Sequence, residues 1–106
     1  MNPSPLNIEM TKLELQGLMV LIDTEIQTLE HEHYHLKPLD FVNLKMLHEL
    51  KRKFQNKVQR HHLDSKVYKT TIDKAHAWIM LIVFNPKTSE VHPTKRILGN
   101  FHQKLI

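Results

Sequence analysis

The sequence predicts an all-α protein, a four-helix bundle built from two antiparallel helical hairpins. The chain has 106 residues, enough for one hydrophobic core, and only two glycines, too few for the many tight turns of a β-sandwich or barrel. Two stretches sixty positions apart also begin alike, because Thr11 and Thr71 each precede a small residue, Gly17 or Ala77, and then a dense apolar block. These observations favour one helical domain over residues 1–106.

The first hairpin is predicted over residues 11–62. Thr11 and Glu14 have the spacing of a capping box, in which each side chain bonds the other residue's backbone N–H, so the first helix should begin there. Apolar residues follow at spacings of three and four. Pro38 suits the first turn of a second helix, which should extend to about Arg60, and the short link makes the two helices antiparallel neighbours.

The second hairpin is predicted over residues 70–106. Thr70 and Asp73 resemble a second capping box, and a last helix should begin near Pro93. The third helix is apolar on nearly all sides through residues 78–84, which places it in the middle of the bundle. The β-branched and aromatic content of that stretch leaves a buried strand, and with it an α+β fold, as the alternative.

Residues 1–10 contain two prolines and no helical period, so they are expected to form a flexible lead-in. Charge is unevenly distributed along the rest of the chain. Residues 1–35 contain six acidic residues and one lysine, whereas residues 36–106 contain 14 basic and 5 acidic residues. Such halves can attract each other within the fold, or each can meet a partner.

Nine histidines are many for this length, and one pair has a spacing suited to metal binding. On a helix, His31 and His35 would share a face at i and i+4, from which two imidazoles can chelate Zn²⁺, Ni²⁺ or Cu²⁺. The alternative is a set of ordinary exposed polar residues at a helix end. The pair therefore predicts a weak, open metal site at most, and no resident cofactor is expected.

The second helix carries a run of basic residues that could bind nucleic-acid phosphates through counterion release. No sequence readout is expected from it, because the following helix is core material with few donors for base edges. The alternative is internal pairing, since an antiparallel hairpin would bring Glu14 near the end of the second helix. The candidate residues of this surface are Lys45, Arg52, Lys53, Lys57 and Arg60.

Catalytic motifs are missing from the sequence, which has no Gly-x-Ser-x-Gly elbow, phosphate-binding glycine loop or His-Glu-x-x-His pattern. The chain has no cysteine, no recognisable signal peptide and no apolar run near the roughly 20 residues that cross a bilayer. We therefore expect a cytoplasmic, non-enzymatic protein–protein interaction module, possibly self-associating, with no small-molecule substrate and no membrane partner. Nucleic-acid binding is the alternative, and metal binding the third.

Overall fold

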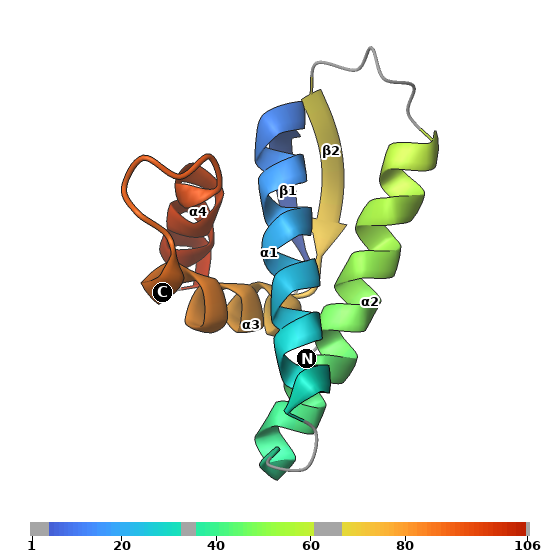
Figure 1. Cartoon of the computed structure of the whole chain (residues 1–106). Coiled ribbons are helices and arrows are strands. Elements are labelled where there is room, and N and C mark those ends of the chain that lie inside the picture. The colour runs from blue at the N-terminus through green and yellow to red at the C-terminus, as the bar shows by residue number, and fades with distance from the viewer. Residues whose placement is uncertain (1–4, 33–35, 61–66, 106) are drawn as a thin grey trace.

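The computed structural model describes residues 5–32, 36–60 and 67–105, which form four helices and one two-stranded sheet (Figure 1). In chain order the elements are β1 (Leu6–Thr11), α1 (Lys12–His31), α2 (Pro38–Arg60), β2 (Val67–Ile72), α3 (Lys74–Phe84), the short 3₁₀ helix η2 (Asn85–Lys87) and α4 (Lys95–Leu105). Among these helices, none is both long and apolar enough to cross a membrane.

The prediction of an all-α fold is confirmed only in part: the described chain is mostly helical, but two segments pair as strands, and the four-helix bundle is not confirmed. The expected flexible lead-in over residues 1–10 is wrong from Leu6 onward, where β1 begins. The alternative of a buried strand over residues 78–84 is also wrong, since that stretch lies in α3 and its 3₁₀ extension begins at Asn85.

The two strands are antiparallel, with Leu6 opposite Ile72 and Thr11 opposite Val67. Burial alternates along β1, where Leu6, Ile8 and Met10 are buried and the residues between them are exposed. This period of two is the pattern of a sheet with one face on the core and one in solvent.

Helix α1 is the central element of the fold. It packs against the sheet and lies antiparallel to α2, while α3 runs across its axis (Figure 1). Its capping box is confirmed, because the Glu14 amide donates to Thr11 Oγ1 at 3.2 Å and the Thr11 amide donates to Glu14 Oε1 at 2.9 Å. Its buried residues include Leu15, Leu18 and Ile22, as the apolar spacing predicts.

Helix α3 is not in the middle of a bundle, as its apolar sequence had suggested. Trp78 is 40% exposed and Ile82 is 64% exposed, and the two share a face at i and i+4. The predicted second capping box is also wrong. Thr70 lies within β2, and Asp73 is the N-cap residue but makes no side-chain cap hydrogen bond. Because Thr70 pairs with Ile8 of β1, its backbone N–H is not available to the Asp73 side chain.

Gly17 lets the segment before α4 pack directly on α1, because a Cβ at this position would lie 2.9 Å from Thr94 Cγ2. Thr94 is fully buried and β-branched, so it cannot easily move aside. We expect Gly17→Ala to lower the free energy of unfolding by about 1 kcal/mol, since overpacking outweighs the gain in helix propensity. Gly99 provides the matched control, because a Cβ there meets no atom within 4 Å. Gly99→Ala should therefore raise stability in urea denaturation, and an equal gain from both variants would contradict this packing.

Candidate functional site

The acidic N-terminal part of the chain is paired within the fold. Five of its carboxylates approach basic side chains that come from α2, β2, η2 and α4. The pairs are Glu9 with Lys69, Glu14 with Arg96, Asp23 with Lys51, Glu25 with Lys87, and Glu30 with His48. Most of the acidic residues in the N-terminal part of the chain therefore form ion pairs with basic residues of other helices and strands.

The basic residues predicted on α2 stay outside these pairs. Lys45, Arg52 and Lys53 are exposed and Lys57 is half-buried, and none of them forms an ion pair within the described part of the chain. The predicted approach of Glu14 to this end of α2 is wrong, because Glu14 pairs with Arg96 of α4. Nothing is described for the side chain of Arg60.

The predicted histidine pair is only half described. His31 is exposed in the last turn of α1, and His35 lies outside the described residues, so the metal site stays a prediction. Across residues 5–32, 36–60 and 67–105, no three His, Cys, Asp or Glu side chains gather as a metal site would require.

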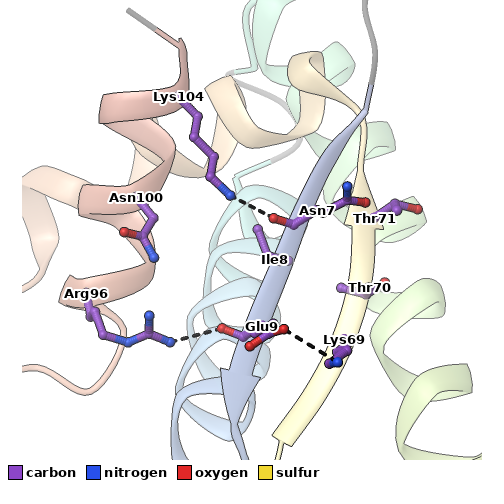
Figure 2. Close-up of a pocket in the computed structure, with 9 residues that line it drawn as sticks. All are labelled: Asn7, Ile8, Glu9, Lys69, Thr70, Thr71, Arg96, Asn100 and Lys104. Atoms are coloured by element: carbon purple, nitrogen blue, oxygen red, sulfur yellow. Dashed lines mark hydrogen bonds and ion pairs between the residues drawn. The ribbon is translucent and has the colours of Figure 1, made fainter.

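A cleft of about 580 Å³ lies between the outer face of the sheet and α4 (Figure 2). Helix α4 contributes Arg96, Asn100 and Lys104, which recur every four residues and so share one face. The strands contribute Asn7, Ile8, Glu9, Lys69, Thr70 and Thr71. All of these residues except Ile8 have amide, hydroxyl or charged side chains, and their aliphatic parts also line the cleft.

The cations of this cleft are already bonded to protein atoms. Lys104 Nζ donates to the Asn7 carbonyl at 2.7 Å, and Arg96 Nη2 donates to the Glu9 carbonyl at 2.9 Å. Lys69 Nζ lies 3.7 Å from Glu9 Oε1. A ligand would have to displace these contacts. We therefore interpret the contacts as a structural brace that holds α4 against β1.

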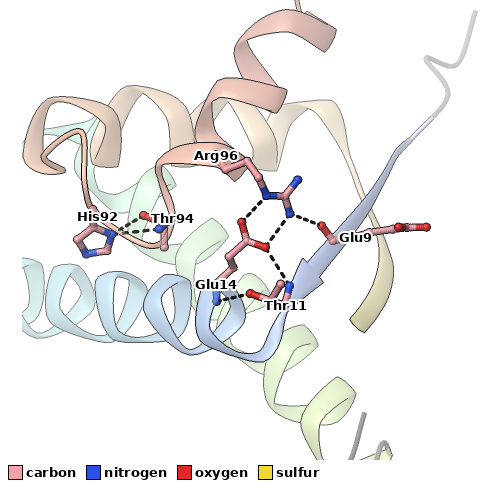
Figure 3. A network of polar contacts seen from close by, with 6 residues as sticks. All are labelled: Glu9, Thr11, Glu14, His92, Thr94 and Arg96. Atoms are coloured by element: carbon pink, nitrogen blue, oxygen red, sulfur yellow. Dashed lines mark hydrogen bonds and ion pairs between the residues drawn. The ribbon is translucent and has the colours of Figure 1, made fainter. Parts of the chain in front are cut away.

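Arg96 and Glu14 form the strongest part of this brace (Figure 3). Arg96 Nε donates to Glu14 Oε2 and Arg96 Nη2 donates to Glu14 Oε1, both at 2.6 Å, which is a bidentate geometry. Burial raises the pKa of Glu14, but hydrogen bonds from Arg96 and Thr11, together with the Arg96 charge, outweigh it and hold that pKa below its ordinary value. The pair joins α1, β1 and α4.

The same contacts establish which backbone groups of the sheet point outward. The Asn7 and Glu9 carbonyls and the Thr11 amide all bond to groups outside the ladder. In an antiparallel pair, residues that point outward stand opposite residues that also point outward. The partners of Asn7 and Glu9 are Thr71 and Lys69, so their N–H and C=O groups face the other edge of the sheet.

The two edges of the sheet therefore differ. Helix α4 covers the β1 edge, whereas α2 lies on the β2 side of the sheet (Figures 1 and 2). On the β2 edge, the outward backbone groups of Lys69 and Thr71 make no hydrogen bond to any described residue. We call these groups, with those of Val67, the open edge.

Sequence reasoning missed this edge because it missed both strands. The signal was present in Leu6–Thr11, where apolar and polar residues alternate without interruption. It was weaker in Val67–Ile72, whose β-branched and aromatic residues are typical of strands.

Comparison with protein-family models, with characterised proteins and with solved structures gives no match. The functional argument therefore depends on the geometry of this chain.

Proposed function

We propose that the protein is a non-enzymatic interaction module that binds an extended segment of a protein partner by strand addition to β2. One observation carries this proposal. The outward N–H and C=O groups of Lys69 and Thr71 are without hydrogen-bond partners among the described residues, whereas α4 occupies the corresponding edge of β1.

An open strand edge is a template for another chain, because its donors and acceptors alternate at the spacing of an extended peptide. Many proteins shorten, charge or cover such edges to prevent unwanted pairing. Here β1 is covered by two cationic side chains, and β2 carries one exposed lysine, Lys69. The outward backbone carbonyls of β1 are hydrogen-bonded by α4 and those of β2 to no described residue, and this difference supports a binding role for β2.

Self-association has weaker support. The exposed large apolar side chains are divided among several elements, with Leu39, Phe41 and Val42 on α2 and Trp78 and Ile82 on α3. A stable interface buries roughly 800 Å² on each partner, more than the two or three such side chains of any one helix supply. Pairing of β2 with a second copy would also bring identical cationic surfaces together, which costs free energy.

Nucleic-acid binding by α2 is a second candidate. Its support is the set of four cations that have no ion-pair partner in the described part of the chain, Lys45, Arg52, Lys53 and Lys57, together with the isoelectric point of about 9.4. This candidate predicts affinity for any duplex at low salt and a steep loss as salt rises.

Thr71→Pro tests strand addition directly. Proline removes the outward N–H and places a ring on the open edge, but it leaves the inward ladder intact. We expect peptides selected from a random displayed library on the unmodified protein to lose at least tenfold in affinity for Thr71→Pro and to keep it for Thr71→Ala. Equal affinity for the two variants would overturn the proposal, and so would a library that yields no binder.

A further inference from the structure

We infer that the segment added to β2 is acidic, with Asp or Glu at alternate positions. This inference rests on strand addition and specifies the chemistry of the partner. Alternate side chains of a strand share one face, and positively charged side chains lie on both sides of the open edge, so an alternating acidic strand meets positive charge in either orientation.

On the outer face of the sheet, the positive charge comes from Lys69. Its side chain is 77% exposed, and its carboxylate partner among the described residues, Glu9 Oε1, is 3.7 Å away on a side chain that is itself 66% exposed. A loose, exposed pair of this kind contributes little and is easily exchanged for a new partner. Residues of an added strand that point to this face would lie directly beside Lys69.

On the other side, the positive charge comes from α2. Lys53 lines a cavity of about 200 Å³ together with Ile72 at the end of β2, so this face of the helix looks toward the strand. Lys57 follows one turn later on the same face, and α2 continues alongside β2 (Figure 1). Neither lysine has an ion-pair partner among the described residues.

Two carboxylates also belong to this cavity, Glu49 and Asp73, and both approach His76. Glu49 Oε2 lies 3.9 Å from His76 Nε2, and Asp73 Oδ2 lies 3.7 Å from His76 Nδ1. They stand near the Ile72 end of the strand. Acidic side chains of a partner should therefore be attracted most strongly to the half of the edge from Val67 to Lys69.

A peptide fits this edge better than a nucleic acid does. Phosphate oxygens accept hydrogen bonds but donate none, so they would leave the outward carbonyls of Lys69 and Thr71 unsatisfied. An extended acidic peptide supplies main-chain donors and acceptors as well as negative charge.

Three nine-residue peptides test the inference, with threonine alternating with glutamate, glutamine or lysine. We expect the glutamate peptide to bind at least tenfold more tightly than the glutamine peptide at low salt, and the lysine peptide to bind most weakly. The double variant Lys53→Glu with Lys57→Glu should reduce the preference for glutamate to the part that Lys69 sustains. Arg52→Glu is the matched control, because it changes charge on a neighbouring face of α2 and should largely keep the preference.

Each other outcome is informative. If the glutamine peptide binds as tightly as the glutamate peptide, and Thr71→Pro weakens both, strand addition stands and the acidic partner is wrong. If no peptide binds, both proposals fail. If a short generic DNA duplex binds instead, and Arg52→Glu weakens it as much as the double variant does, α2 is a phosphate-binding surface and the acidic peptide is overturned.

Discussion

Replacing Arg96 with methionine should lower the free energy of unfolding by about 2 to 3 kcal/mol at neutral pH. Methionine keeps the aliphatic stem but leaves the Glu14 carboxylate, whose side chain is 8% exposed, without its bidentate partner. Arg96 itself is half exposed, which keeps the expected loss below that of a fully buried pair. The loss also frees the Glu9 carbonyl, so the contact between α4 and β1 should weaken with it.

Glu14→Gln provides the control for this prediction. The double variant should be nearly as stable as Glu14→Gln alone, because methionine then leaves no buried charge behind. Urea denaturation of the four proteins measures the coupling between the two residues. Independent, additive losses would contradict a direct ion pair.

The same pair predicts how stability depends on pH. Because the folded state holds the pKa of Glu14 below its ordinary value of 4.5, its contribution is fully present above pH 4.5 and is lost as pH falls through the lowered folded value. Glu14→Gln should therefore show a smaller loss of stability than the unmodified protein across that acidic range. Parallel pH profiles for the two proteins would show that Glu14 is not the group responsible.

Two neighbouring prolines in β2 should destabilise the protein to very different degrees. Thr70 lies opposite Ile8, and its backbone N–H points toward β1. Thr70→Pro therefore removes a hydrogen bond between the strands and should lower the free energy of unfolding by about 3 kcal/mol or prevent folding. The N–H of Thr71 points away from β1, so Thr71→Pro should lower the free energy of unfolding by no more than about 1 kcal/mol. Circular dichroism during urea denaturation distinguishes them. Equal destabilisation by both prolines would contradict the conclusion that the Thr70 N–H faces β1 and the Thr71 N–H faces outward.

The helices were predictable because their signals are local. The capping box at Thr11, the proline at Pro38 and the apolar spacing along α1 each depend on neighbours within one or two turns. The two strands, in contrast, pair residues more than fifty positions apart, and neither is stable without the other. The alternating pattern of the strands was hard to recognise, because the neighbouring prolines and threonines resemble those of loops and helix caps.

The candidate site was less predictable than the fold. The cations of α2 were identified from composition, and four of them remain without an ion-pair partner among the described residues. The open edge could not be foreseen, because it depends on α4 covering β1 and on which carbonyls Arg96 and Lys104 contact. That contact brings together residues at opposite ends of the chain, and no local pattern encodes it.

Amide hydrogen exchange of the unmodified protein is the most direct test of the open edge. The account predicts slow exchange at Tyr68, Thr70 and Ile72, whose amides face β1, and fast exchange at Lys69 and Thr71, whose amides face outward. Addition of a bound peptide should then slow exchange at Lys69 and Thr71. Protection of those two amides in the free protein to the level of Thr70 would mean that the edge is already occupied, and strand addition to β2 would be wrong.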